Sequence, residues 1–428
     1  MEYLTLMSAR EAAAAIRAKE ITLLELVDAC LRRIDEREPT VNAWAFIDPE
    51  RARAAARACD AAEPSGPLHG VPVGIKDVID TCDMPTEYGS TIHRGHRPSR
   101  DAACVSLIRR AGGIVLGKTV STEFAMYQPS KTVNPHNPGH TPGGSSSGSA
   151  AAVADRHVPL ALGTQTSGSI IRPAAYCGVI GYKPTVGTFA IEGIKALASS
   201  LDTLGVLSRS LDDLSLMYNV FCGVDLAADP LPAREPRQVR LGFWQPPFGE
   251  PSRDADGLRL AITRLRAVGY EVAPAVMPDS FASLNDVHAA LMAYEVARNH
   301  LYEYEPARRA QMGDSTTAVI EQGWNISFEA YLRCREQTRQ AQIAFDQIAQ
   351  SFDAILVPSA TGEAPAGTSW TGDPVFNRMW SLLGTPALTL PVGNGPNGLP
   401  IGVQLVGRRD SDRVLLDVAR RLERAVSG

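Results

Sequence analysis

Short apolar runs alternate along this chain with segments in which apolar positions recur every three or four residues. The runs predict buried strands, and the three-to-four spacing predicts helices with one buried face. The expected strands are 43–48, 71–79, 113–116, 158–162, 178–182, 239–244, 270–276, 354–358, 387–392 and 401–406. The expected helices are 12–19, 22–37, 49–62, 102–111, 211–221, 255–268, 374–384 and 411–426.

This alternation predicts an α/β fold with a central, twisted, mixed or largely parallel sheet, covered by helices on both faces. Residues 280–350 break the alternation, because they are nearly all helical, with long helices expected at 281–305 and 328–350. They are interpreted as a helical excursion from the sheet. Residues 225–238 are rich in proline and acidic residues and predict a surface excursion.

Composition narrows the class of protein. Hydrophobic residues make up 44% and charged residues 21% of the chain, as in soluble globular proteins. A net charge of −5 does not suggest a nucleic-acid partner. No apolar run is long enough to span a membrane, and the first residues lack the pattern of a signal peptide. Seven cysteines without CxxC spacing favour reduced thiols and a cytoplasmic location.

Two loops rich in serine and glycine flank the predicted strand 158–162, and they are 141–150 and 163–172. Each loop leads into a segment that can begin a helix. Glycines allow close backbone approach, and a helix N-terminus presents unpaired N–H groups. The loops can therefore place serine hydroxyls beside backbone donors, as nucleophilic acyl transfer requires. The alternative is a pair of flexible linkers, which the apolar strand between them argues against.

Lys76 lies inside the apolar run 71–79 of a chain with only six lysines. Burial disfavours the ammonium form and lowers the pKa of a lysine, so a neutral Lys76 can accept a proton near pH 7. The alternative is a buried ion pair between Lys76 and Asp77 or Asp80. Residue types alone leave both open.

Three other motifs give weaker signals. Gly112–Thr119 matches the P-loop expression, but its Ile-Val-Leu centre predicts a strand rather than a phosphate-binding loop. His136 and His140 have helical metal-site spacing, but Pro138 and Gly139 exclude the helix. A Ser-His-Asp enzyme remains an alternative, although no serine lies in a GxSxG elbow.

Three ordered motifs, at 74–77, 143–150 and 164–174, resemble those of the amidase signature family. The resemblance runs almost end to end and is greatest to malonamidase-type enzymes. It implies one amidase domain over 1–428 with the amidase signature fold, and a core at 65–210 that carries the catalytic triad. It also implies no cofactor and no metal.

The resemblance assigns a Ser–cis-Ser–Lys triad in which Lys76 is the base, Ser145 the bridging serine after a cis peptide bond, and Ser169 the nucleophile. The implied oxyanion donors are the backbone N–H groups of Thr166, Ser167, Gly168 and Ser169. Many relatives have glycine where this chain has Ser167, so a positive φ there would cause strain.

The implied activity is hydrolysis of the C–N bond of a small amide through a Ser169 acyl-enzyme, with release of ammonia or an amine. Arg172 can hold a substrate carboxylate by a bidentate contact. Its alternative is an ion pair with an acidic neighbour. The other candidate substrate-binding residues are Gly144, Gln165, Tyr127 and Trp380.

Several alternatives stay open. With Trp370, the aromatic residues Tyr127 and Trp380 can instead line a pocket for aryl amides, carbamates or urea-type substrates, while core packing is the other interpretation of Trp380. A second alternative is the glutaminase-type subunit of a tRNA-dependent amidotransferase, and a third is a non-catalytic binding scaffold. We expect a small-molecule amide as the partner and leave a homodimer open.

Overall fold

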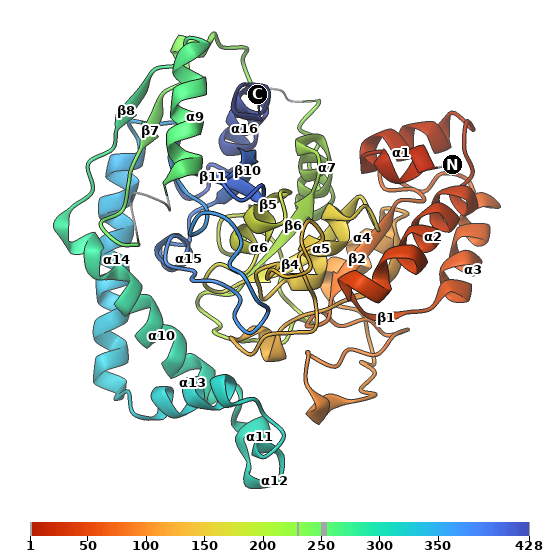
Figure 1. The fold of residues 1–428 in the computed structure, drawn as a ribbon, viewed down its shortest axis with the longest axis horizontal. Helices are drawn as coiled ribbons and strands as arrows, with labels where there is room; N and C mark the ends of the chain where they lie inside the picture. Colours follow the sequence, from red (N-terminus) through yellow and green to blue (C-terminus); the bar gives the residue numbers. More distant parts are fainter. Residues whose placement is uncertain (1, 229–230, 250–254, 428) are drawn as a thin grey trace.

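An eleven-stranded sheet runs through the computed structural model, which describes residues 2–228, 231–249 and 255–427 (Figure 1). In chain order the strands are β1 (Trp44–Ile47), β2 (Pro72–Lys76), β3 (Ile114–Thr119), β4 (Leu160–Gln165), β5 (Ile180–Lys183), β6 (Thr203–Ser208), β7 (Leu241–Phe243), β8 (Val272–Pro274), β9 (Ala354–Pro358), β10 (Ala387–Asn394) and β11 (Pro400–Val406). Their order across the sheet is β1-β3-β2-β4-β6-β5-β10-β11-β9-β7-β8.

The sheet is mixed, as the alternating pattern predicts. Strand β2 pairs in parallel with β3 and β4, and β7 pairs in parallel with β8 and β9. The strands between these two groups pair antiparallel, from β4 through β6, β5, β10 and β11 to β9. Side chains that follow the carboxyl ends of β2 and β4 therefore meet at one edge of the sheet, where open α/β sheets commonly bind ligands.

Helices cover the sheet on both sides. They are α1 (Ala9–Arg17), α2 (Leu23–Val41), α3 (Pro49–Asp60), α4 (Ala103–Arg110), α5 (Ser147–Ala154), α6 (Ile171–Tyr176), α7 (Leu211–Cys222), α9 (Asp256–Ala267), α10 (Leu284–Asn299), α11 (Leu301–Tyr304), α12 (Pro306–Arg309), α13 (Asp314–Trp324), α14 (Phe328–Ala349), α15 (Arg378–Leu382) and α16 (Asp412–Ser427). Figure 1 shows α1–α3 on one side of the molecule and α10–α14 on the other. In the described residues, no helix combines the length and the apolar character needed to cross a bilayer.

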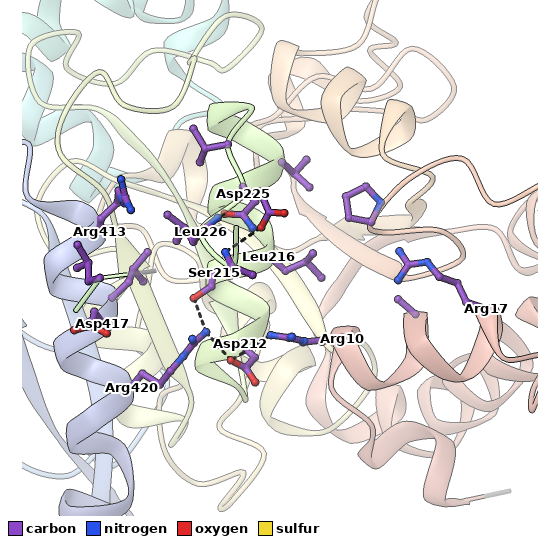
Figure 2. A pocket seen from close by; sticks show the side chains of 18 residues that line it. Arg10, Arg17, Asp212, Ser215, Leu216, Asp225, Leu226, Arg413, Asp417 and Arg420 are labelled. Atoms are coloured by element: carbon purple, nitrogen blue, oxygen red, sulfur yellow. Dashed lines mark hydrogen bonds and ion pairs between the residues drawn. The ribbon is translucent and has the colours of Figure 1, made fainter. Parts of the chain in front are cut away.

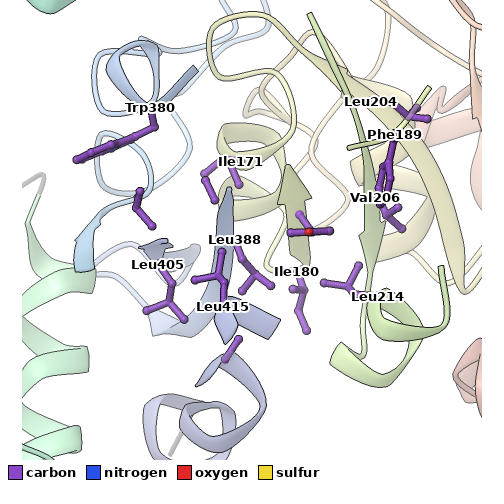
Figure 3. Close-up of a cluster of buried hydrophobic side chains, with 14 of the residues drawn as sticks. Ile171, Ile180, Phe189, Leu204, Val206, Leu214, Trp380, Leu388, Leu405 and Leu415 are labelled. Carbon is purple, nitrogen blue, oxygen red and sulfur yellow. The ribbon is translucent and has the colours of Figure 1, made fainter. Parts of the chain in front are cut away.

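Strand β4 shows how the sheet divides the core into two layers. Successive side chains of a strand point to opposite faces. Leu160 and Leu162 accordingly join the cluster that contains Leu214 of α7, and Ala161 joins the cluster that contains Ala151 of α5. Figure 3 shows part of the first cluster, with Leu214 beside Val206. Small residues on the α5 side let that helix lie close to the sheet and bring the serine loops next to β4.

Local signals predict several elements closely. Ser8 caps α1 by accepting from the Glu11 N–H at 3.1 Å, and the Glu11 carboxylate accepts from the Ser8 N–H at 2.8 Å. This reciprocal pair is a capping box, and with it α1 begins at Ala9 rather than at the predicted residue 12. Strand β9 has the predicted bounds 354–358. Strand β2 is shorter than the predicted 71–79 and ends at Lys76, because a turn follows.

Strand β6 was missed by the sequence pattern, which predicted no strand between residues 182 and 211. It pairs antiparallel with both β4 and β5 and is buried along its whole length. A strand buried on both faces shows no apolar–polar alternation. Gly205 further weakens the strand signal, but a Cβ there would lie 2.2 Å from the Tyr182 carbonyl oxygen, so the close strand packing requires glycine.

The helical region differs from the prediction in its breaks. Helix α10 ends at Asn299 rather than at 305, and Pro306 begins the short helix α12 after an extended Glu305. A residue before proline is driven out of the helical region, which explains why the helix α11 ends at Tyr304, just before Glu305. Residues 225–228 and 231–238 are mostly exposed, as predicted, and the rest of that predicted excursion lies outside the described residues. The proposed boundaries 65–210 and 280–350 stay predictions.

Candidate active site

Lys76 is the last residue of β2, and its side chain is completely buried. Its Nζ lies 2.7 Å from Ser145 Oγ and 2.8 Å from Thr164 Oγ1. Thr164 reaches this position because β4 runs parallel to β2, with Ile75 paired to Leu162. The register of two neighbouring strands therefore places a lysine, a threonine and a loop serine within hydrogen-bonding distance.

The environment of Lys76 favours the neutral amine. Burial lowers the pKa of Lys76 well below its usual value, and the charge of Asp202 offsets this shift only in part. Among the residues that the structure describes, Lys76 makes no ion pair with an acidic side chain. Asp77 instead faces Lys118 at 3.7 Å, and Asp80 accepts from the Tyr88 hydroxyl at 3.0 Å. The ion-pair alternative for Lys76 is therefore wrong.

The two serine loops lie directly against each other. The Gly144–Ser145 peptide bond is cis, and α5 begins two residues later at Ser147. The Ser146 N–H donates to the Ser169 carbonyl at 3.3 Å, which joins the loops through their backbones. Ser145 Oγ already accepts from Lys76 on the other side. Ser145 thus lies between the buried amine and the loop that carries Ser169.

Ser169 faces a small pocket at the carboxyl end of β4. The pocket residues are Ala125, Met126, Tyr127, Thr166, Ser167, Ser169, Arg172, Leu197, Met292, Val296, Val319 and Pro374. Within the described chain, the Ser169 hydroxyl makes no hydrogen bond to another residue. A hydroxyl that is free of internal partners and faces a pocket is available to a bound molecule, and catalytic hydrogen bonds commonly shorten only when substrate is present.

The backbone between Thr166 and Ser169 is held from outside by its carbonyl groups. The Thr166 carbonyl accepts from His288 Nε2 at 2.9 Å, and the Ser167 carbonyl accepts from Ser381 Oγ at 2.8 Å. The next two carbonyls accept from the N–H groups of Arg172 and Ser146. The N–H groups of residues 166–169 make no hydrogen bond to any residue of the described chain. They remain available for an oxyanion.

Ser167 and Gly168 fit this loop for different reasons. Ser167 does not have a positive φ, so the strain considered for a serine at this position does not arise. Gly168 is required sterically, because a Cβ there would lie 2.5 Å from Asn377 Oδ1. The Thr166 hydroxyl donates to Asp202 at 2.5 Å, which ties the start of the loop to the segment before β6.

Gln165 uses its side chain to shape the loop. Its Oε1 accepts from the N–H groups of Ile170 and Ile171 at 2.9 and 3.1 Å, and its Nε2 donates to Ser381 Oγ at 3.1 Å. Gln165 is not among the residues that line the pocket. These contacts favour a positioning role over the predicted contact with substrate.

Arg172 is a buried guanidinium on α6 that also lines the pocket. Its Nη2 donates to the Gly144 carbonyl at 2.7 Å and to Thr371 Oγ1 at 3.3 Å. Its Nε and Nη1 have no partner in the described residues, and it forms no ion pair there. Asp373, the acidic residue nearby, pairs with Arg378 at 3.7 Å. The alternative of an Arg172 ion pair is thus wrong, and Gly144 contacts the guanidinium through its carbonyl.

The predicted aromatic residues separate into two groups. Tyr127 is half-buried and lines the pocket. Trp380 was predicted to contact substrate, but it does not line the pocket. It is 1% exposed and packs edge-on against Phe345 and Trp244, at ring separations of 5.3 and 5.9 Å. Figure 3 shows its ring at the edge of the cluster. Trp370 is half-exposed at the surface.

Replacing Trp380 should therefore affect stability before substrate binding. We expect Trp380→Ala to lower the free energy of unfolding by about 3–5 kcal/mol, because it removes a large buried ring. Urea unfolding followed by circular dichroism would measure this change. A fully stable Trp380→Ala with a raised KM would contradict the placement of this ring in the core.

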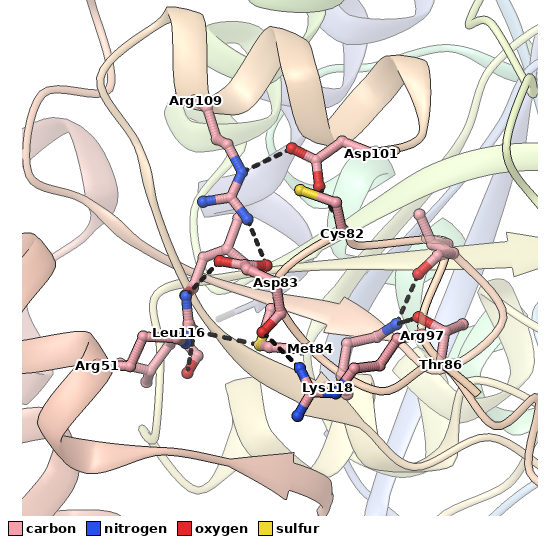
Figure 4. A network of polar contacts seen from close by, with 12 residues as sticks. Arg51, Cys82, Asp83, Met84, Thr86, Arg97, Asp101, Arg109, Leu116 and Lys118 are labelled. Atoms are coloured by element: carbon pink, nitrogen blue, oxygen red, sulfur yellow. Dashed lines mark hydrogen bonds and ion pairs between the residues drawn. The ribbon is translucent and has the colours of Figure 1, made fainter. Parts of the chain in front are cut away.

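The polar clusters away from Ser169 have structural partners. His136 Nε2 and His140 Nδ1 bond to the carbonyls of Cys177 and Ala364, so the two rings serve separate segments. In the described chain, one group of potential metal ligands lies close together: Cys82, Asp83 and Asp101. Figure 4 shows Arg109 between Asp101 and Asp83, with contacts of 2.9 and 2.7 Å, so arginine already neutralises these carboxylates.

A larger cavity of about 440 Å³ lies between α1, α7 and α16 (Figure 2). It shares no lining residue with the pocket at Ser169. Two of its arginines pair with Asp212, which lies 3.7 Å from Arg10 and 2.6 Å from Arg420. It contains none of the loop serines and does not compete as a catalytic site.

Comparison with known proteins places this geometry in a family. A sequence model of the family described as Amidase matches residues 25–416. The chain belongs to the amidase family. The Ser–cis-Ser–Lys triad is a general feature of this family, and the protein is a hydrolase that acts on amide C–N bonds, as the family and the similar amidase structures indicate.

Similar amidase-family proteins cover nearly the whole chain. The glutamyl-tRNA(Gln) amidotransferase subunit from Chloroflexus aggregans is 36% identical over 99% of this chain and 96% of its own length. The crystal structure of an amidase superposes with a TM-score of 0.87 at 28% identity, over 98% of this chain and 100% of that one. The peptide amidase from Stenotrophomonas maltophilia has a TM-score of 0.80 at 28% identity, over 98% and 97%. None of these three is described as a malonamidase, so greatest resemblance to that type stays a prediction.

The sequence of this amidase gave no site prediction for three residues that shape the site. Thr164 lies in the motif at 164–174, and its contact with Lys76 gives it a position at the site. Asp202 gains its position through its contact with the Thr166 hydroxyl. His288 lies in the helical region 280–350, far from any motif, and no local signal distinguishes it from a core histidine. Only the packing of α10 against the loop reveals its contact.

Proposed function

We propose that this amidase hydrolyses a small amide that carries a carboxylate, through an acyl-enzyme on Ser169. The observation that carries the proposal is the buried Arg172 guanidinium, which has two unpartnered nitrogens and shares a pocket with the Ser169 hydroxyl. A buried charge without a counter-ion is costly, and a substrate carboxylate would supply the missing partner.

Acylation begins at Lys76. Its neutral amine takes the Ser145 proton, Ser145 takes the proton of Ser169, and the Ser169 oxygen attacks the amide carbonyl carbon. The 2.7 Å contact between Lys76 and Ser145 supports the first transfer. Collapse of the tetrahedral intermediate breaks the C–N bond. The proton returns through Ser145 to the leaving nitrogen, which departs as ammonia or an amine.

The loop 166–169 supplies the charge stabilisation. Its unbonded N–H groups support the assignment of an oxyanion hole from Thr166, Ser167, Gly168 and Ser169. Removing one such donor typically costs about 3–4 kcal/mol of barrier. Water then attacks the acyl-enzyme, with the same serines and Lys76 moving its proton, and releases the carboxylic acid.

The side chains that line the pocket indicate which acyl group the substrate carries. Met292, Val296 and Val319 come from α10 and α13, and together with Leu197 they form an apolar wall around Ser169 and Arg172. This arrangement supports a compact aliphatic acyl group with a carboxylate at its far end. Tyr127 also lines the pocket and keeps aryl amides, carbamates and urea-type compounds as the alternative substrates.

The test compares carboxylated amides with neutral analogues of the same length. Wild-type protein should release more ammonia or amine from the carboxylated series. Arg172→Gln should lower kcat/KM for that series by about 10- to 100-fold more than for the neutral series, because a charge-assisted contact is lost. The measured quantity is the ratio of kcat/KM for the carboxylated series to kcat/KM for the neutral series. Arg172→Gln also removes the contact with the Gly144 carbonyl, but a loss from that cause affects both series and cancels in the ratio.

Arg378→Gln is the matched control, because Arg378 lies near Arg172 but does not line the pocket. The ratio of kcat/KM between the carboxylated and neutral series should be the same for Arg378→Gln as for wild type. Equal losses on both substrate series in Arg172→Gln would remove the carboxylate contact from the proposal.

The same panel separates the other functions. Activity on glutamine that requires added partner subunits would favour the role named in the amidotransferase relative. A folded protein with no activity on any amide would favour a binding scaffold. We further propose a cytoplasmic location, supported by seven cysteines that are all free thiols. A homodimer stays a prediction.

A further inference from the structure

Helix α10 lies directly behind the loop that carries Ser169. It presents His288 and Met292, one turn apart, to that loop. His288 Nε2 bonds to the Thr166 carbonyl at 2.9 Å, and Met292 Sδ accepts from the Ser167 hydroxyl at 3.4 Å. The helical region thus contacts the catalytic loop at two successive residues.

Because the peptide group is planar, a contact that holds the Thr166 carbonyl also sets the direction of the Ser167 N–H. In a trans peptide the carbonyl and the following N–H point in opposite directions. The bond joining Thr166 and Ser167 is trans, and its carbonyl bonds to His288, which is buried and is not among the residues that line the pocket. The Ser167 N–H must then point the other way. Ser381 acts similarly on the next peptide, whose N–H belongs to Gly168.

The state of the His288 ring suits this task. The carbonyl oxygen can only accept, so Nε2 must carry the hydrogen. Burial lowers the pKa of His288 to about 4, so the ring stays neutral at physiological pH and Nδ1 is an unprotonated acceptor. Nδ1 has no partner in the described residues. The side chain is completely buried, so the Thr166 carbonyl is the one protein contact that its polar atoms make there.

We propose that His288 is a positioning residue for the oxyanion hole: by holding the Thr166 carbonyl, it directs the Ser167 N–H toward the substrate oxygen. This inference rests on the proposed acyl-enzyme function. The contact between His288 and the Thr166 carbonyl should stabilise the transition state more than the substrate complex, because the substrate oxygen gains its full charge only in the transition state. Loss of the contact should therefore lower kcat and leave KM nearly unchanged.

Two substitutions at His288 separate positioning from packing. His288→Leu keeps an apolar volume but removes the donor, and we expect kcat to fall about 10- to 100-fold with KM changed less than about twofold. His288→Gln places an amide N–H near the position of Nε2 and should restore most of kcat. Melting temperatures of both variants would show that each is folded.

His300→Leu is the matched control. His300 follows the same helix, is completely buried, and bonds to the Val296 carbonyl rather than to the loop. Its kcat should stay within about twofold of wild type. If His288→Leu does not fold, Ser381→Ala provides a second test, because it releases the Ser167 carbonyl and should also lower kcat selectively.

An unchanged kcat in folded His288→Leu, or equal losses in the Leu and Gln variants, would overturn the positioning role. Ser169→Ala, assayed in parallel, keeps the two proposals distinct. If Ser169→Ala is inactive while His288→Leu is normal, only the His288 inference fails. If Ser169→Ala is fully active, the acyl-enzyme itself is wrong.

Discussion

Ser169→Ala is expected to lower amide hydrolysis by about 10⁴-fold or more, because the oxygen that forms the acyl bond is missing. Binding should survive, since Arg172 and the apolar wall stay in place. Stability should also survive, because the Ser169 hydroxyl makes no hydrogen bond within the described chain. Ammonia or amine release from the best amide in the panel measures the first effect, and a thermal melt measures the second.

Ser149→Ala is a suitable control for this prediction. Ser149 is a buried serine of α5, but its hydroxyl donates to the Leu162 carbonyl at 2.8 Å and does not line the pocket. It should lose some stability and retain activity. Substantial turnover by Ser169→Ala would mean that another serine attacks the amide.

Lys76→Met is expected to produce a loss of similar size, about 10⁴-fold in kcat, because no other base among the described residues contacts Ser145. Methionine fills much of the same volume, so the buried site should stay packed. Lys183→Met is the matched control. Lys183 is equally buried but donates to the carbonyls of Pro184 and Thr385, away from the serines. Steady-state kinetics on one amide would compare the two variants.

The pH dependence of the rate and of the folding stability also tests the role of Lys76, because each should change with pH in a defined direction. Burial lowers the pKa of Lys76, and its neutral form is the active one, so the rate should rise with pH through that lowered pKa and then level off. The unfolded chain binds a proton on this lysine that the folded chain lacks. Its contribution to folding stability therefore rises with pH between the lowered pKa and about 10.4.

Lys76→Met should flatten that rise relative to wild type, as urea unfolding at several pH values would show. Comparison with wild type is needed because burial also lowers the pKa of Lys118 to about 8 and of Lys183 to about 7, and both act in the same direction. An identical slope in wild type and Lys76→Met would show that Lys76 is charged in the folded protein.

The sequence alone was sufficient to predict most helices and strands and to predict acyl-transfer chemistry at the two serine loops. Apolar spacing is a local signal, and it predicted β9 with its observed bounds and α1 to within three residues at each end. Apolar neighbours also predicted that Lys76 is buried. These properties depend on residues adjacent in the chain, so no knowledge of the fold is needed to recognise them.

Only the tertiary structure decided the partners of these residues. Lys76 meets Ser145 and Thr164 across 69 and 88 positions of sequence, and His288 meets Thr166 across 122. A local pattern reports that a side chain is buried but not which group lies opposite it. For this reason the ion pairs considered for Lys76 and Arg172 gave way to a serine contact and an unpaired guanidinium. For the same reason Trp380 moved from the pocket to the core.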